Sequence, residues 1–406
     1  MNNHLKWALQ DMIKDYFKEM VKKGESREKI VITQCTEEAM KIPEIHGAIK
    51  FFVDSDCIEK LNESESEYVI TKGYYEWLQT EMANEPKEKE PLDFNITTKL
   101  KQRFCKDMGI PIKIFHEPYF ESRLRLYDSQ YNSIEKYKTF LELLSNFKSE
   151  QDYFEYYNKL KDNIIKYLGS REGMKRFKEE NMNEFSIVNT GFPNKDIYKE
   201  TFDGKIFLSI DMVKANFTAL KHYDKDIVGG AETYEEFISM FTEYDYFKSS
   251  KYLRQVVFGN HNPKRQVTYE RYLMDNVLTG ILTIVPKEDI VFFSNDEIVI
   301  EMKEELDHNY IKDIRNLILN IEKELGIKLT QELFRLRKIP GTKEGYIKKF
   351  IGNGNGKGYE FKCLDSLTMP FVLRAYKNEK VKEEDKVFFH EGRLAKLIEV
   401  PKIEVV

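Results

Sequence analysis

The sequence has few cysteines, no long apolar run and no low-complexity tract. Its four cysteines are far apart among 406 residues, and no two have the Cys-x-x-Cys spacing of a zinc site. We therefore expect reduced thiols and a cytoplasmic location. No segment approaches the roughly 20 apolar residues that a membrane-spanning helix needs, so the sequence predicts no membrane contact.

The amino terminus lacks the apolar centre of a signal peptide, because charges run throughout its first 24 residues. Its apolar residues recur at helical spacing, which predicts a packing helix. Prolines and alternating charges at 84–91 predict a linker. We expect a helical module at 1–84 that is available to a protein partner, then a mixed, mostly helical region at 92–200.

An excess of positive charge is also absent, because the net charge is −5. This balance argues against a nonspecific nucleic-acid coat protein. One segment, 328–362, is nevertheless basic, with nine lysines or arginines against three glutamates. It predicts either a phosphate-facing surface or one solvated face of a sheet. The candidate nucleic-acid-binding residues are Arg335, Arg337, Lys338, Lys348 and Lys349.

From residue 205 onward the pattern of apolar residues becomes regular. It predicts strands at 205–211, 289–294, 297–302, 332–339 and 345–351, and a helix at 310–326. The stretch between the first two strands is predicted to be largely helical. The first four strands with their helices have the β-α-β-β-α-β order of a ferredoxin-like sheet, so we expect an α+β fold. In such a sheet Asp211, which ends the first strand, lies near Asp296 and Glu297 on the hairpin.

Three clustered carboxylates raise one another's pKa unless a cation lies between them. Oxygen ligands without histidine favour Mg²⁺ or Mn²⁺ over zinc. Asp211, Asp296 and Glu297 are therefore the candidate metal ligands and catalytic residues. Two such ions promote phosphoryl transfer, which favours attack of a 3′-hydroxyl on a nucleotide and release of pyrophosphate. The alternative to a metal site is that Asp296 and Glu297 are solvated acids at a hairpin turn, without a catalytic role.

The segments FLSIDMVKANF (207–217) and FFSNDEIVIE (292–301) resemble the two metal-binding motifs of palm-domain polymerases and nucleotidyltransferases. The Ser-x-Asp-Glu pattern is similar to that of lesion-bypass DNA polymerases and of tRNA-His guanylyltransferases. The resemblance covers about 205–351. The first motif departs from both classes, because it lacks the paired aromatics of the former and the Gly-Arg of the latter. The resemblance implies a palm at 201–351, a fingers-like region at 92–200 and a thumb-like α/β extension at 352–406.

The same resemblance implies where a nucleotide would bind. The position under the sugar is Asn216, which can hydrogen-bond a 2′-hydroxyl, or its neighbour Phe217, which would exclude one. Cations for the triphosphate are expected from Lys214, Arg254, Lys264 and Arg265, because arginine grips phosphate with two parallel bonds. The glycine-rich 352–358 lacks the Walker spacing, so it predicts a flexible connection.

These observations predict a template-directed polymerase that uses nucleoside triphosphates and a DNA or RNA primer-template. The first alternative is a template-independent or tRNA-directed nucleotidyltransferase. The second is a nucleic-acid-binding protein without catalysis, in which Asp211→Asn would leave binding intact.

Overall fold

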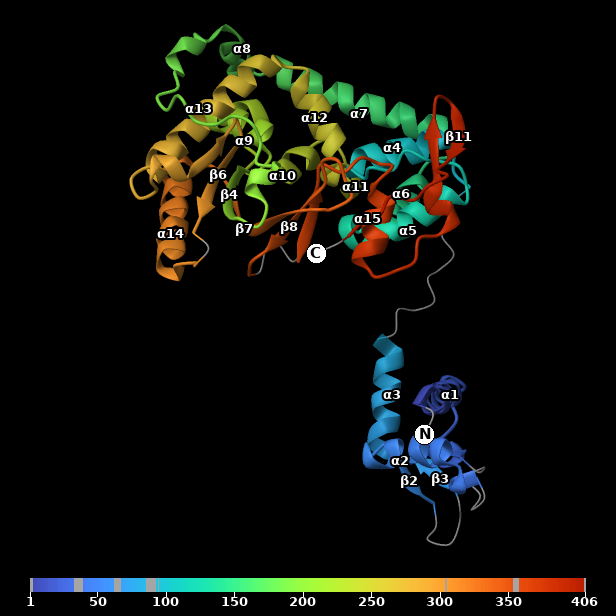
Figure 1. The fold of residues 1–406 in the computed structure, drawn as a ribbon. Coiled ribbons are helices and arrows are strands. Elements are labelled where there is room, and N and C mark those ends of the chain that lie inside the picture. The colour runs from blue at the N-terminus through green and yellow to red at the C-terminus, as the bar shows by residue number, and fades with distance from the viewer. Residues whose placement is uncertain are drawn as a thin grey trace. The chain divides into compact units, whose positions relative to one another are not determined.

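The chain forms two compact units, 1–92 and 93–406, in a computed structural model (Figure 1). The structure describes residues 3–32, 39–61, 67–84, 93, 95–303, 305–352 and 358–404. Within these ranges no helix is both long and apolar enough to cross a membrane. The linker predicted at 84–91 lies outside the described residues except for its first position, and 353–357 of the glycine-rich segment also lies outside them.

The smaller unit combines three helices with a three-stranded sheet. The helices are α1 (Asn3–Lys22), α2 (Pro43–Asp54) and α3 (Lys72–Asn84), and the strands are β1 (Val31–Ile32), β2 (Ile58–Lys60) and β3 (Tyr68–Ile70). The sheet is antiparallel in the order β1-β3-β2. Phe17, Phe52, Ile70 and Leu78 form its core. The helical character expected for this module is present, and the short strands β1, β2 and β3 are an addition.

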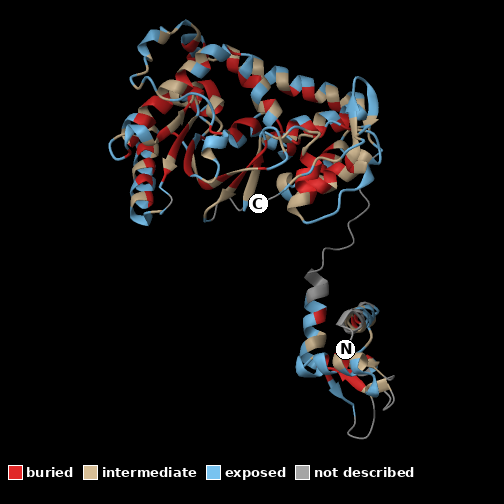
Figure 2. Cartoon of the chain, in the orientation of Figure 1, coloured by how far each residue is buried: buried red, intermediate tan, exposed pale blue. Residues whose placement is uncertain are grey.

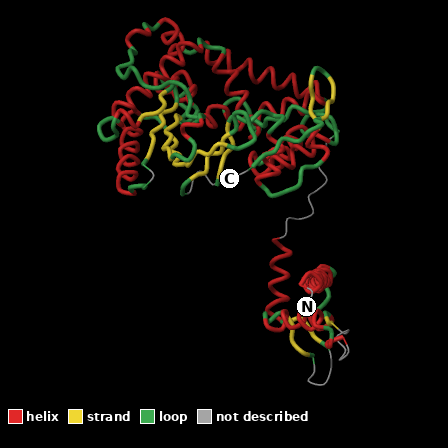
Figure 3. Tube along the Cα trace, viewed as in Figure 1, coloured by secondary structure: helices red, strands yellow, loops and turns green. Residues whose placement is uncertain are grey.

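The larger unit begins with five helices, which Figure 3 shows in red. They are α4 (Thr98–Met108), α5 (Tyr119–Tyr131), α6 (Ser133–Leu144), α7 (Glu150–Ser170) and α8 (Glu172–Glu179). Thr97 caps α4, because its hydroxyl accepts from the backbone N–H of Leu100, and Gly109 ends it in the left-handed conformation that glycine adopts easily. Buried rings hold the bundle together, among them Phe104, Phe140 and Tyr153.

A six-stranded antiparallel sheet follows in the order β5-β6-β4-β7-β8-β9. The strands are β4 (Ile206–Met212), β5 (Ile290–Phe293), β6 (Glu297–Met302), β7 (Leu329–Lys338), β8 (Tyr346–Phe350) and β9 (Tyr359–Lys362). Helix α14 (His308–Leu325) lies between β6 and β7 in the chain. The strands and helix predicted between 205 and 351 are therefore confirmed within one or two residues, apart from an earlier start for β7, and β9 is an addition.

Five helices connect β4 to β5, namely α9 (Ala215–Tyr223), α10 (Tyr234–Ser239), α11 (Asp245–Ser249), α12 (Lys251–Gly259) and α13 (Pro263–Ile281). Helix α13 packs against α9, α14 and β6, and α12 packs against α4 and α7. Figure 1 shows the sheet toward one end of the unit and α4, α5, α6 and α15 toward the other, with α7 running along one side. Helix α12 therefore joins the sheet region to the bundle.

Side chains of β4 alternate between two faces, as in any strand. Ile206, Leu208 and Ile210 share one face with Ile298 and Ile300, and all five are buried. The other face carries Phe207, Ser209 and Asp211 in order. Figure 2 shows how burial concentrates in these strands. Because β4 changes from apolar to acidic along its second face, the sheet is a packing surface at one end and a polar surface at the other.

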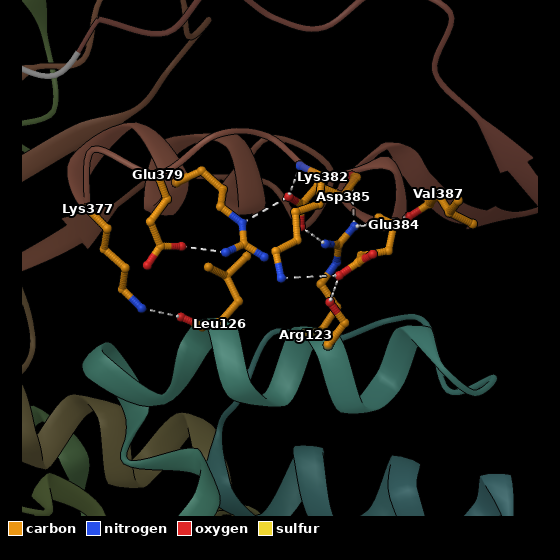
Figure 4. Close-up of polar contacts among 10 residues, drawn as sticks. Arg123, Leu126, Lys377, Glu379, Lys382, Glu384, Asp385 and Val387 are labelled. Carbon is orange, nitrogen blue, oxygen red and sulfur yellow. Dashed lines mark hydrogen bonds and ion pairs between the residues drawn. The ribbon is translucent and has the colours of Figure 1, made fainter. Parts of the chain in front are cut away.

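The carboxy-terminal part is held to α5 by a buried ion network (Figure 4). It contains α15 (Met369–Tyr376) and the hairpin β10 (Val387–His390) with β11 (Arg393–Lys396). Asp385, 1% exposed, accepts from Arg123 at 2.9 Å, from Arg374 at 2.9 Å and from the backbone N–H of Lys382 at 2.8 Å. The segments expected at 92–200, 201–351 and 352–406 thus pack as one body.

Candidate active site

The acids of the two motifs meet at one end of the sheet. Asp211 lies opposite Glu297 in the β4–β6 register, and the backbone N–H of Met212 donates to the carbonyl of Asp296 at 2.8 Å. Strand β4 therefore ends against the hairpin crest. The proximity expected from the order of elements is confirmed for all three acids.

Ser294 shapes the hairpin crest. Its backbone N–H donates to the carbonyl of Glu297 at 2.9 Å, and its hydroxyl accepts from the backbone N–H of Glu297 at 3.1 Å. The same hydroxyl donates to the carboxylate of Asp296 at 3.1 Å. A serine two residues before the first acid thus fixes the turn that presents Asp296.

An open hollow of about 360 Å³ lies at this end of the sheet. Three carboxylates line it, those of Asp211, Asp296 and Glu270, together with three cations, Lys214, Lys251 and Arg254. The hollow therefore combines carboxylates that can bind a cation with positively charged side chains that can bind an anion. Such a mixture suits a metal-bound phosphate ester.

The pKa of Asp211 is raised to about 7, first by burial and then by the charges of Asp296, Glu297 and Glu332. Lys348 acts in the opposite direction. Asp211 retains a large accessible surface because its carboxylate faces the hollow, while the walls remove part of its hydration. A raised pKa in a hollow is typical of functional carboxylates.

Glu297 points toward the sheet. Ser209, 2% exposed and two residues before Asp211 on the same face, donates its hydroxyl proton to Glu297 Oε1 at 2.5 Å. Glu297 is close enough to raise the pKa of Asp211, yet it does not line the hollow as Asp296 does. The two acids of the hairpin are therefore held in different environments.

Glu270 of α13 was missed by the sequence reasoning. It is 8% exposed, and its pKa is raised to about 7 by burial and by the charge of Asp296. The signal was available, since Gln266, Leu273 and Met274 are buried on the same helix face. An acid at the helical spacing of an apolar stripe is unusual and marks a candidate site.

The predicted phosphate-binding cations separate into two groups. Lys214 and Arg254 line the hollow, and Lys251, which was not predicted, joins them. Lys214 adopts the left-handed conformation with φ 49°, directly after β4, and its ammonium pairs with Glu235. A strained backbone is common at functional sites.

Lys264 and Arg265 do not reach the hollow. Lys264 is exposed in the first turn of α13. Arg265 donates to the carbonyl of Glu180 at 2.6 Å, so its guanidinium is used within the fold.

Asn216 and Phe217 also separate. Asn216 lines the hollow, with its side-chain oxygen accepting from the backbone N–H of Phe217 at 2.9 Å. Phe217 is 3% exposed and packs against Tyr234, Phe237 and Phe258. The suggestion that Phe217 contacts a nucleotide is therefore wrong, because its ring belongs to the core.

The basic segment does not form one surface. Arg335, Arg337 and Lys349 lie on one face of the sheet, whereas Lys338 and Lys348 lie on the other. Lys348 is 4% exposed, 3.5 Å from Glu332. Arg335 donates to the carbonyl of Gly204 at 2.6 Å, and Arg337 and Lys338 contact Asp203. The five candidate residues, all within the described part of this segment, therefore form neither a common phosphate-facing surface nor one solvated face.

The donor set fits a hard divalent cation, since Asp211, Asp296 and Glu270 present only carboxylate oxygens to the hollow. In the described part of the chain, no three Asp, Glu, His or Cys side chains stand close enough to hold an ion as they are. Mutual repulsion keeps uncompensated carboxylates apart, and a bound cation removes that repulsion. The acids therefore need to move together when a metal binds.

No protein-family model, curated protein or solved structure matches the chain.

Proposed function

We propose that the chain is a metal-dependent nucleotidyltransferase, in its leading form a template-directed polymerase that adds nucleotides to a 3′-hydroxyl. The observation that carries the proposal is the hollow in which Asp211 and Asp296 meet across two strands and face Lys214, Lys251 and Arg254. Carboxylates that can bind a cation and positively charged side chains that can bind phosphate lie in one hollow, as this reaction requires.

The sheet supports a palm for this function. With β4, β5, β6 and β7 as first to fourth strands, the spatial order is second, third, first, fourth, with every neighbouring pair antiparallel. Helices follow the first and third strands. That arrangement agrees with the ferredoxin-like β-α-β-β-α-β order of palm domains. Fold alone does not specify a reaction, so the hollow remains the main support.

In the proposed reaction a 3′-hydroxyl gives its proton to solvent and forms a bond to the α-phosphorus of a nucleoside triphosphate, while the bond between the α-phosphorus and the bridging oxygen breaks and pyrophosphate leaves. Bound Mg²⁺ or Mn²⁺ supplies charge that stabilises the attacking and leaving oxygens. Asp211 and Asp296 hold the cation, and Glu297 contributes negative charge beside Asp211. Lys251 and Arg254, in the first turn of α12, bind phosphate oxygens.

A second row of cations provides a path for a polyanion and supports the template-directed form. Arg103 and Lys106 of α4 stack on the ring of Tyr252 at 4.8 and 4.5 Å, and Tyr252 lies between Lys251 and Arg254 on α12. Arg103 and Lys106 line a separate hollow of about 600 Å³ with Lys99 and Lys113. This row takes the place of the basic strands as the proposed strand-binding surface.

Asn216 supports use of ribonucleotides as well as deoxyribonucleotides. Its amide nitrogen is a hydrogen-bond donor in the hollow, because its oxygen is already bonded to the backbone. The aromatic ring that would exclude a 2′-hydroxyl is in the core.

The proposed binding of a protein partner by the smaller unit is supported by exposed aromatic rings, among them Phe51 and Trp77.

The test is primer extension with Mn²⁺ on wild type, Asp211→Asn and Asp296→Asn. Template-dependent products from wild type that both substitutions abolish would support the polymerase. Products that ignore the template base would favour the template-independent alternative. If wild type forms no product and Asp211→Asn binds nucleic acid as wild type does, the proposal is refuted and the non-catalytic binding protein is the remaining alternative.

A further inference from the structure

The most unusual charged side chain in the hollow is Glu270. It is 8% exposed, and no described residue forms a hydrogen bond or an ion pair with its carboxylate. A mostly buried carboxylate that no donor contacts is costly in a folded protein, because its charge loses much of its hydration without a compensating hydrogen bond. Such a group calls for a specific reason to be there.

Another acid of the same helix shows what an ordinary buried carboxylate looks like. Asp275, five residues later on α13 and 2% exposed, accepts from the backbone N–H groups of Val188 and Asn189 at 2.8 and 3.0 Å. It thereby fixes the segment before the sheet to the helix. Glu270 has no such role, so its burial is not explained by the packing of α13.

The position of Glu270 points to a cation. It lines the hollow with Asp211 and Asp296, and the charge of Asp296 is near enough to act on it. None of the three cationic side chains of the hollow is paired with Glu270. Lys214 pairs with Glu235 and Arg254 lies over the ring of Tyr234 at 5.7 Å, whereas Lys251 is exposed.

The hairpin acid that would otherwise complete the site has a partner already. Glu297 accepts the short hydrogen bond from Ser209, so moving it toward the hollow would leave a buried hydroxyl without its acceptor. Moving Glu270 breaks no hydrogen bond or ion pair with a described residue. Moving Glu270 toward a cation therefore costs less free energy than moving Glu297.

We propose that Glu270 is a ligand of a divalent cation in the hollow, with Asp211 and Asp296, so that the third carboxylate comes from helix α13. The assignment rests on the proposed metal-dependent function and changes its ligand set. It predicts a cation site shared by the sheet and the connecting helices, whereas the two sequence motifs place every ligand on β4 or on the β5–β6 hairpin.

The test is Mn²⁺ binding to the full chain without nucleotide, followed by the electron paramagnetic resonance of free Mn²⁺. The variants are Glu270→Gln, Glu297→Gln and Asp211→Asn, with Glu288→Gln as an exposed control beside β5. Glu270→Gln should weaken Mn²⁺ binding about 10-fold or more, as for loss of a ligating group, and more than Glu297→Gln does. The Mn²⁺-induced rise in melting temperature should shrink in the same order.

The outcomes separate the two proposals. If Glu270→Gln binds Mn²⁺ as wild type does while Asp211→Asn does not, Glu270 is no ligand and the proposed function survives. If Glu297→Gln weakens binding more than Glu270→Gln, the third ligand comes from the hairpin. If wild type binds no Mn²⁺, both proposals fall. Melting of Glu270→Gln in EDTA serves as the folding control, and it should not fall below wild type.

Discussion

Two places in the larger unit contain carboxylates shielded from water, and their surroundings differ. Asp385, at the carboxy-terminal network, accepts from two guanidinium groups and a backbone N–H. Glu270, at the hollow, has no partner among the described residues, and Asp211 faces other acids. A compensated buried charge holds segments together, whereas an uncompensated one indicates a missing ligand.

The comparison predicts that removing the two kinds of charge changes the free energy of unfolding in opposite directions. Neutralising the acid of the network should destabilise the protein, because Arg123 would lose its acidic partner and Arg374 one of its two. Neutralising an acid of the hollow should stabilise the protein without metal, because a repulsive, poorly hydrated charge disappears. The predictions below begin with the largest expected effect.

Asp385→Ala should lower the free energy of unfolding by about 3–5 kcal/mol, since Arg123 and Arg374 would remain buried without their shared carboxylate. Urea unfolding measures the change, with Glu399→Ala as an exposed control. A loss below 1 kcal/mol would remove the distinction between the two regions.

Glu270→Gln should raise the free energy of unfolding in EDTA, by about 3 kcal/mol above pH 7. The folded-state pKa of about 7 exceeds the ordinary 4.5, so the folded wild type holds the proton more tightly. The contribution of Glu270 to the stability of wild type is therefore highest below pH 4.5 and falls as the pH rises to 7. The advantage of the variant should grow across that window and level off above it, as thermal unfolding at several pH values would show. A difference that does not change with pH would contradict the assignment of charge to this site.

Arg254→Ala should raise the KM for nucleoside triphosphates about 10- to 100-fold, because a charge-assisted hydrogen bond to phosphate is lost. Lys264→Ala should change it little, since Lys264 is exposed away from the hollow. Steady-state kinetics on both variants tests which cations serve the hollow. Equal effects would restore the wider basic surface expected from the sequence.

Asn216→Phe should reduce the use of ribonucleotides relative to deoxyribonucleotides by about 10-fold, because the ring would occupy the space of a 2′-hydroxyl. Competition between the two substrates measures the ratio. Phe217→Leu should leave that ratio unchanged while lowering stability, since Phe217 packs in the core. The reverse pattern would assign the sugar contact to Phe217.

The sheet was predictable because its signals are local. The short apolar runs of β4, β5 and β6 identify strands, and the spacing of Ile311, Ile314 and Ile318 identifies α14. Their order then placed Asp211 beside Asp296 and Glu297.

The rest of the site was not predictable from local patterns, because it depends on tertiary packing. Lys251 faces the hollow only because α12 lies against α4 and α7. Arg335 and Lys348 look alike in the sequence, but the register between β7 and β8 puts them on opposite faces. Glu270 required attention to an acid on a buried helix face, a signal that motif searching overlooks.

The central place of β4 in the sheet has a consequence for how the protein is made. Ser209 and Glu297 are 88 residues apart in the chain, and β4 also needs β7 on its other side. During synthesis the acids therefore cannot assemble until β7 has left the ribosome, however early the amino-terminal helices fold. Pairings over such distances form late and slowly. Mn²⁺ binding would therefore report completion of the sheet, and a chain ending before residue 329 should not show it.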